Sequence, residues 1–430
     1  MKKIGIVSLG CAKNLVDSEM ILGMLKDGGY EIVNDPSEAD GIIINTCGFI
    51  LDAKQESIDT ILEMAKYNKK LIVVGCLTER YEEDLKKELP EVDLFIPIRD
   101  YPHIAERIND LFNNDALKKG LCPTSRVLST PKFTAYLKIS EGCNNRCTYC
   151  AIPLIRGSFK SRPLNELIEE AKMLASRGVK ELVVISQDTT RYGTDIDDKT
   201  TIVTLLNELL KIQEFEYIRM LYLYPNEVTD ELLELMGKEK RLTPYFDMPI
   251  QHASSRILKA MNRRGDKEFL YDLFKRTRKF IPNAILRTTI IVGFPGETEE
   301  DFNELLEFIQ DIKFDHLGAF TYSKEEDTIA YDMENQIDEK VKKDRLNRLM
   351  KIQRKISYDL NKTHIGEIME GLIVAKKGSN EYEFRSGWNA PDDVDGKIIV
   401  TSTKPLKLGE KVKVTITDAF AYDLYGEVLN

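Results

Sequence analysis

The sequence predicts an α/β protein in three parts: an N-terminal doubly wound parallel sheet, a central partial (β/α)6 barrel and a small five-stranded antiparallel β-barrel at the C-terminus. Three observations predict this class. Short apolar runs alternate with helical patterns over residues 1–116, the alternation returns in six further strand-helix repeats, and the pattern then changes to period two. A chain of 430 residues is long enough for about three domains.

The N-terminal part, residues 1–116, has strand runs that are apolar throughout, which is typical of a parallel sheet covered on both faces. The strands are expected at 4–8, 41–46 and 71–75, and helices at 17–27 and 53–68. A cysteine comes soon after each strand run: Cys11, Cys47 and Cys76. Because parallel strands end along one edge of a sheet, we expect the three thiols to converge. Taken singly, each fits a packed core residue better.

Residues 117–131 lose this periodicity and carry Gly and Pro, so they are predicted to form a linker. The central part follows at residues 132–360. Its six predicted strands are 135–140, 181–186, 218–223, 245–250, 284–292 and 316–321. In such a fold the chemistry lies at the carboxyl ends of the strands.

One charged amphipathic helix, residues 337–360, is predicted to close the central part. The last part, residues 361–430, alternates apolar and polar positions over 368–375, 382–385, 397–401, 411–417 and 424–428. Period two with polar turns between the runs predicts a small β-barrel.

Composition narrows the class of protein. With 42% hydrophobic and 31% charged residues the chain is an ordinary globular protein, not a disordered or collagen-like one. The net charge of −10 fits a basic protein partner better than a nucleic acid. No apolar run reaches the ~18 residues of a membrane span, so no membrane partner is expected. Without a signal segment we expect the reducing cytoplasm, where seven cysteines bind metal or fill cores.

The strongest chemical signal is Cys143, Cys147 and Cys150, a Cys-x-x-x-Cys-x-x-Cys run just after the first central strand. Three thiolates on a short loop can hold three corners of an iron-sulfur cube and leave the fourth iron open for chemistry. The alternative is structural zinc, which takes a closed set of four ligands. Only Cys122, in the linker, could complete such a set.

This spacing, with Tyr149 before the last cysteine, resembles the radical S-adenosylmethionine (SAM) superfamily. There the open iron binds SAM, and an electron from the cluster splits SAM to give a 5′-deoxyadenosyl radical. The resemblance implies that Cys143, Cys147 and Cys150 hold a radical-SAM 4Fe-4S cluster.

Over essentially the whole chain the sequence is similar to one branch of that superfamily, the methylthiotransferases. The resemblance implies a second, auxiliary 4Fe-4S cluster on Cys11, Cys47 and Cys76, with Cys122 left without a role. It also implies that the C-terminal barrel is a substrate-binding TRAM domain. No catalytic side chain is expected beyond the cluster ligands.

The resemblance further points to SAM contacts in the central part. They are Tyr149, Gln187, Gln251, Gly293 and Glu297. Gln187 departs from the Gly-Gly-Glu that many radical-SAM enzymes have at this place. Gln187 also fits a polar turn that caps a helix, and Gly293 and Glu297 also fit a Gly/Pro turn in which Thr298 is the N-cap of the next helix.

Three neighbouring side chains have two interpretations each. Arg263 and Arg264 are either a solvated helix end or a clamp on a carboxylate. His252 fits a satisfied turn histidine better than a proton donor.

The branch inserts a methylthio group into an unreactive C–H bond, with one SAM as methyl donor and a second SAM as radical source. Its substrates are the β-carbon of an aspartate in small-subunit ribosomal protein uS12, or an adenosine in transfer RNA. Residues 365–430 carry eight basic and eleven acidic residues, which favours the basic protein, or the ribosome that holds it. The stretch from Gly10 to Glu19 also resembles the ribosomal-protein group.

Two further expectations complete this interpretation. An electron donor such as flavodoxin or ferredoxin is expected as a partner. The alternative from another class is a non-catalytic, zinc-bound interaction protein.

Overall fold

The computed structural model describes residues 2–113, 115–197, 199–391 and 395–429. The chain forms two compact units. The first comprises Met1–Thr130, Tyr136–Asn144 and Cys150–Met173, and the second comprises Pro131–Ala135, Asn145–Tyr149 and Leu174–Asn430. The outermost residues of the predicted N-terminal and C-terminal parts, 1 and 430, lie outside the described residues.

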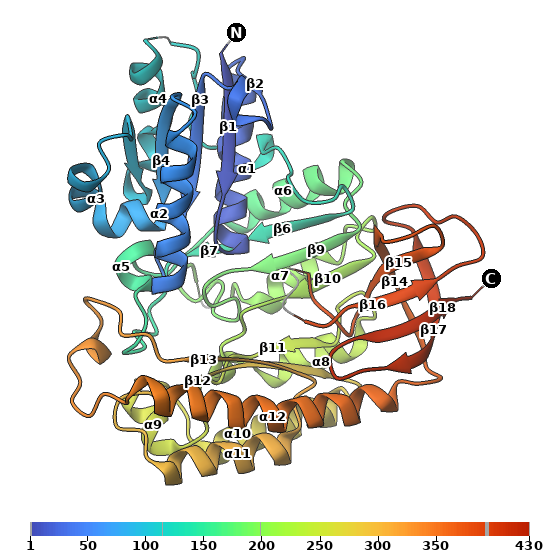
Figure 1. The fold of residues 1–430 in the computed structure, drawn as a ribbon. Coiled ribbons are helices and arrows are strands. Elements are labelled where there is room, and N and C mark those ends of the chain that lie inside the picture. The colour runs from blue at the N-terminus through green and yellow to red at the C-terminus, as the bar shows by residue number, and fades with distance from the viewer. Residues whose placement is uncertain (1, 114, 198, 392–394, 430) are drawn as a thin grey trace. The chain divides into compact units, whose positions relative to one another are not determined.

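The first unit contains a five-stranded parallel sheet of order β2-β1-β3-β4-β5 (Figure 1). Its strands are β1 (Lys3–Ser8), β2 (Glu31–Ile32), β3 (Gly41–Thr46), β4 (Lys70–Gly75) and β5 (Leu94–Pro97). The helices between them are α1 (Ala12–Asp27), α2 (Leu51–Ala65), α3 (Cys76–Glu88) and α4 (Ile104–Phe112). The doubly wound parallel sheet is confirmed.

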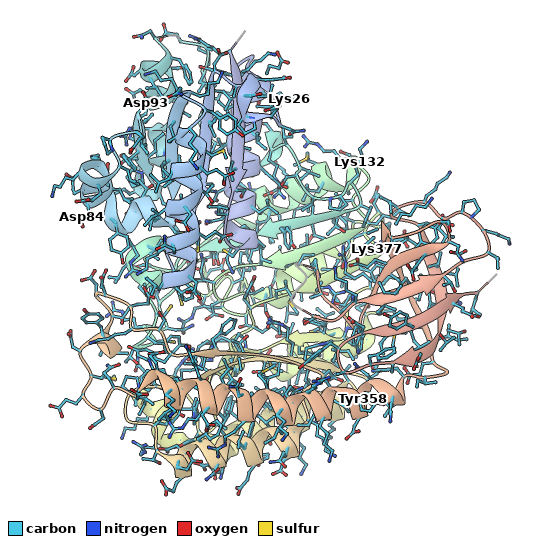
Figure 2. The ribbon with its side chains drawn as sticks, viewed as in Figure 1. Lys26, Asp84, Asp93, Lys132, Tyr358 and Lys377 are labelled. Atoms are coloured by element: carbon cyan, nitrogen blue, oxygen red, sulfur yellow. The ribbon has the colours of Figure 1, made fainter. Side chains whose placement is uncertain are left out.

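The sheet is buried on both faces because successive β3 side chains enter opposite cores. Ile43 packs with Ile21 and Ile72, whereas Ile42 and Ile44 pack in a separate cluster with Ile61 and Val73. This is why the strand runs carry no polar alternation. Figure 2 shows charged side chains such as Lys26, Asp84 and Asp93 on the outside of this unit.

In the first unit, two short strands flank the cysteine loop in the sequence. A two-stranded antiparallel sheet pairs β7 (Ser140–Glu141) with β8 (Lys160–Ser161). Helix α5 (Ile152–Arg156) lies between them in sequence, and α6 (Leu164–Ser176) follows.

The central strands form two three-stranded sheets, ordered β10-β9-β6 and β11-β12-β13, and all of them belong to the second unit except residues 136–138 of β6, which belong to the first. Their bounds are β6 (Thr134–Lys138), β9 (Glu181–Ile185), β10 (Tyr217–Met220), β11 (Tyr245–Asp247), β12 (Ile285–Val292) and β13 (His316–Thr321). Hydrogen bonds from Ile218 N to Arg241 O and from Leu223 N to Asp247 O join the two sheets. The result is the expected partial barrel.

Helices follow the central strands as predicted. They are α7 (Ile202–Leu209), α8 (Asp230–Lys238), α9 (Ser255–Ala260), α10 (Lys267–Phe280), α11 (Glu299–Ile312) and α12 (Glu339–Thr363). Helix α12, which packs on β13 and α11, is the predicted charged amphipathic helix (Figure 1).

The C-terminal residues close into a barrel of order β14-β15-β16-β18-β17. The strands are β14 (Ile368–Lys376), β15 (Glu381–Ser386), β16 (Ile398–Thr401), β17 (Lys411–Ala419) and β18 (Leu424–Val428). Four pairs are antiparallel, as expected, but β16 and β18 are parallel. A closed ring of five strands cannot alternate direction at every neighbour, so one parallel pair is unavoidable.

Candidate active site

The three N-terminal cysteines lie at neighbouring strand ends of the first unit. Cys11 begins α1 as its N-cap, Cys47 follows β3, and Cys76 is the first residue of α3. Burial raises the pKa of the Cys47 thiol to about 11, and the neighbouring thiols of Cys76 and Cys11 raise it further. The structure therefore brings the three thiols together, although their role as ligands stays a prediction.

Glycine is required where these strand ends meet. Gly75, directly before Cys76, has φ +99, and a Cβ there would lie 2.7 Å from the backbone oxygen of Thr46. A Cβ on Gly10 would lie 3.0 Å from Cβ of Cys47. Larger residues would push the cysteine-bearing backbones apart.

A buried cation lies against this thiol group. Arg156, from α5, donates a hydrogen bond from Nη2 to Sγ of Cys76 at 3.4 Å and another to Oδ1 of Asn14. Its Nη1 donates to Oδ2 of Asp17 at 2.7 Å. Burial lowers the pKa of Arg156, but Asp17 and Glu141 outweigh it and hold that pKa well above its usual value. The guanidinium is therefore always charged.

Polar atoms around the cysteines are left without a hydrogen-bond partner among the described residues. They are Oδ1 of Asn45, Oγ1 of Thr78 and Oη of Tyr101, all buried. Tyr101 interacts electrostatically with Asp17, Arg156 and Cys76. Such orphaned atoms are costly unless a polar group binds beside them.

The donor chemistry of this site fits an iron-sulfur cluster. Three thiols from three strand ends, with a cation beside one of them, match the thiolate ligation of a 4Fe-4S cluster with one open iron. In the described parts of the chain, no group of three or more His, Cys, Asp or Glu residues is placed to hold a single metal ion. Ligands of a cluster bind different iron atoms, so they need a wider spacing.

The loop that carries the second cysteine set contributes to both units. In the first unit Cys143 N donates to Gly157 O, and Ala151, the residue after Cys150, packs with Cys76. In the second unit Arg263 donates from Nη1 to Oη of Tyr149 at 3.3 Å and to Sγ of Cys147 at 3.8 Å. Arg263 is thus no solvated helix end.

Within the second unit, polar side chains near the ends of the central strands also hold the cysteine loop. Asn145 Nδ2 donates to Asp188, in the turn after β9, at 2.8 Å. Burial raises the pKa of that aspartate, and its hydrogen bonds oppose the shift. Arg191 and Arg264 both donate to Oδ1 of Asn145 and pair with Glu227. The predicted turn at Gln187 therefore adjoins the cysteine loop through its neighbour Asp188.

Of the other predicted SAM contacts, Gln251 has the clearest functional signature. Its φ of +70 is rare for a residue other than glycine, and β12 holds it there through Gln251 N to Thr289 O and Ile291 N to Gln251 O. Strained backbone of this kind concentrates at functional sites.

Glu297 and Gly293 build a turn together. Oε2 of Glu297 accepts from Gly293 N at 2.8 Å, and its Oε1 accepts from Arg345 at 2.8 Å. The following N-cap box of Thr298 and Asp301 is present. Nδ1 of His252 accepts from Ser254 N at 3.0 Å, as a turn histidine does, but its buried Nε2 has no hydrogen-bond partner among the described residues, so the histidine is only half satisfied. These contacts give Glu297 a structural role, and its contact with SAM stays a prediction.

Sequence reasoning missed that two arginines donate to cysteine sulfur. Nothing in the sequence assigned Arg156 a role, although it comes six residues after Cys150. In the sequence alone, an arginine at this place cannot be told from one at an exposed helix end, so its burial beside the cysteine loop could not be predicted.

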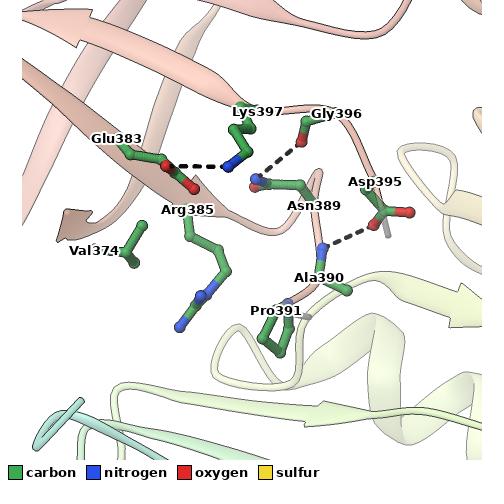
Figure 3. Close-up of a pocket in the computed structure, with 9 residues that line it drawn as sticks. All are labelled: Val374, Glu383, Arg385, Asn389, Ala390, Pro391, Asp395, Gly396 and Lys397. Atoms are coloured by element: carbon green, nitrogen blue, oxygen red, sulfur yellow. Dashed lines mark hydrogen bonds and ion pairs between the residues drawn. The ribbon is translucent and has the colours of Figure 1, made fainter. Parts of the chain in front are cut away.

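The barrel is attached to the central strands within the second unit. Arg385 donates from Nε to Oε2 of Glu181, on β9, at 2.8 Å. Figure 3 shows Arg385 beside Glu383, which pairs with Lys397 at 3.6 Å, in a pocket of the barrel. This pocket is polar and contains no cysteine.

Family profiles match three stretches of the chain. The uncharacterized family UPF0004 matches residues 3–97, the radical SAM superfamily matches 137–309, and the TRAM domain matches 365–429. No helix in the described ranges is both long enough and apolar enough to cross a membrane.

Full-length relatives are found among bacterial proteins. "Ribosomal protein uS12 methylthiotransferase RimO" of Clostridioides difficile is 49% identical over 100% of this chain and 99% of its own. The protein of the same name from Caldicellulosiruptor saccharolyticus is 49% identical over 100% of both chains.

Solved structures share the fold at much lower identity. The radical SAM methyltransferase TsrM of Kitasatospora setae, solved with tryptophan and a SAM analogue, aligns with a TM-score of 0.54 at 13% identity, over 74% of this chain and 73% of that one. Its form with cobalamin and a [4Fe-4S] cluster aligns over 89% and 80%, with the same score at 12% identity.

Proposed function

Because this chain belongs to the family of ribosomal protein uS12 methylthiotransferases, we propose that it methylthiolates the β-carbon of an aspartate in uS12 in the cytoplasm. The sequence identity of 44–49% to relatives of that name, over essentially the full length, carries the proposal. The bound clusters and SAM supply the electron, the methyl group and the radical for this radical SAM reaction.

The chain's own residues have separate tasks in this proposal. Cys143, Cys147 and Cys150 hold the radical-SAM cluster, and Cys11, Cys47 and Cys76 hold the auxiliary one. Tyr149, Gln187, Gln251, Gly293 and Glu297 bind SAM.

Hydrogen bonds within the second unit support these tasks. Arg263 orients Tyr149 and Cys147, and Asp188 fixes the loop through Asn145. The positive φ of Gln251 turns that residue after β11 while β12 holds its backbone. Positioned groups of this kind lower the entropic cost of bringing cofactor and substrate together.

Substrate identity is tested directly by mass spectrometry. Enzyme reconstituted without oxygen is incubated with SAM, sulfide and a flavodoxin-type electron donor, once with uS12 and once with transfer RNA. We expect a methylthio group on uS12 and none on transfer RNA. A methylthio group on transfer RNA alone would overturn the proposed substrate.

Because the two cysteine sets are proposed to have different tasks, their variants should lose different activities. Cys143→Ala should abolish SAM cleavage, whereas Cys11→Ala should leave SAM cleavage and stop sulfur insertion. Cys122→Ala, outside both sets, is the matched control and should retain both activities. Zinc in place of iron, or loss of neither activity in either variant, would contradict the two-cluster assignment.

A further inference from the structure

In the first unit, the Arg156 guanidinium donates a hydrogen bond to a cysteine sulfur, Sγ of Cys76. The Nη2 to Sγ distance is 3.4 Å, and the Arg156 side chain is 2% exposed. Helix α5, which carries it, starts two residues after Cys150. One residue thus joins a thiol of the first cysteine set to the segment that follows the second set.

The surroundings of Arg156 fix its position. Asp17 is 1% exposed and accepts from Nη1 of Arg156, and Glu141 lies 3.3 Å from the same nitrogen. Ile155 packs with Cys76 and Ala151 in one apolar cluster. Asp17 and Glu141 hold the charged group of Arg156, and apolar packing holds helix α5. The guanidinium is therefore fixed in position beside Sγ of Cys76.

We propose that Arg156 sets the electron affinity of the auxiliary cluster by donating a hydrogen bond to Sγ of Cys76. This inference rests on the proposed ligand role of Cys11, Cys47 and Cys76. Reduction adds one electron, and hence one negative charge, beside a guanidinium whose charge is permanent. Hydrogen bonds and positive charge at cluster sulfurs stabilise the reduced form, so Arg156 raises the reduction potential.

Lys138 offers a matched control for this proposal. Its Nζ pairs with the same two carboxylates, Asp17 at 2.5 Å and Glu141 at 2.8 Å, and its side chain is 9% exposed. In the described part of the chain, the hydrogen bonds of its Nζ go to these carboxylates and not to sulfur. Removing Lys138 therefore tests the shared ion-pair network without the sulfur contact.

The experiment uses the full chain with Cys143, Cys147 and Cys150 replaced by Ala, so that only the auxiliary site holds iron. Dithionite titration followed by electron paramagnetic resonance gives its reduction potential. We expect Arg156→Met to favour the oxidised form at least tenfold, about 59 mV for one electron, and Lys138→Met to change it much less. Arg156→Lys, which keeps the charge and loses the planar fork, should fall between them.

Each outcome has a distinct meaning. An unchanged potential in Arg156→Met, or an equal shift in Lys138→Met, would overturn the role of Arg156 while leaving the cluster in place. No iron in the parent chain would overturn the auxiliary site itself, and this inference with it. Should Arg156→Met fail to fold, as judged by its melting temperature, Arg156→Lys against Lys138→Met decides the question.

Discussion

At the scale of single residues, buried polar side chains in the motif from Gly10 to Glu19 hold the first site together. Asn14 donates to Thr46 O, Ser18 donates to Ser8, and Asn45 donates to Ser18. The sequence allowed this stretch to be recognised as a family marker, but it could not show that each polar group has a partner far along the chain. Buried polar groups survive only with such partners.

Gly75 gives a residue-scale prediction of stability. Gly75→Ala places a side chain at φ +99, which costs about 1–2 kcal/mol. It also forces a Cβ to within 2.7 Å of the Thr46 carbonyl, and overpacking of this kind costs about 1–3 kcal/mol more. Chemical denaturation should show the sum, together with loss of iron from the auxiliary site.

The control is Gly29→Ala in the same unit. Gly29 has φ +79, but a Cβ added to it would meet nothing within 4 Å, so only the conformational cost of about 1–2 kcal/mol applies. Equal destabilisation by the two variants would show that close approach of the strand ends is unimportant.

At the scale of elements, the predicted linker contains a buried anchor. Arg126 is 0% exposed and pairs with Glu19 of α1 at 2.9 Å and with Glu170 of α6 at 2.5 Å. Helices and barrel strands followed from apolar periodicity, because burial of one face places an apolar residue at every second, third or fourth position, and the parallel strands followed from unbroken apolar runs. An isolated arginine in an aperiodic stretch has no such pattern, so its burial could not be predicted.

Arg126→Met should therefore destabilise the first unit strongly. It removes the buried cation that pairs with Glu19 and leaves Glu170 paired with Arg162, at a cost of about 3–5 kcal/mol, measured by urea denaturation. Lys87→Met is the control, since Lys87 and Asp84 are 71% and 76% exposed, and the loss of such a pair costs under about 1 kcal/mol. A cost for Arg126→Met as small as that of the control would refute the anchor.

At the scale of the whole molecule, an acidic protein is proposed to modify a basic ribosomal protein. The net charge of −10 includes exposed acidic residues on the barrel. Glu381 of β15 and Glu427 of β18 both lie beside Thr401 of β16, the strand between them. The charge count of the barrel predicted this sign from sequence. Only the strand register shows that two of the acidic residues share one face.

Complementary charge acts mainly on encounter, so ionic strength should change KM and leave kcat unaltered. Between about 0.01 M and about 0.1 M ionic strength the screening length falls from about 30 Å to about 10 Å, and steered association slows about tenfold or more. Steady-state assays with uS12 should therefore show KM rising with salt. The double variant Glu381→Gln, Glu427→Gln should raise KM at low salt and weaken the salt dependence, while SAM cleavage without uS12 stays unchanged. If KM does not change with salt in either the parent protein or the double variant, substrate recognition depends on apolar contacts instead, because salt does not screen those.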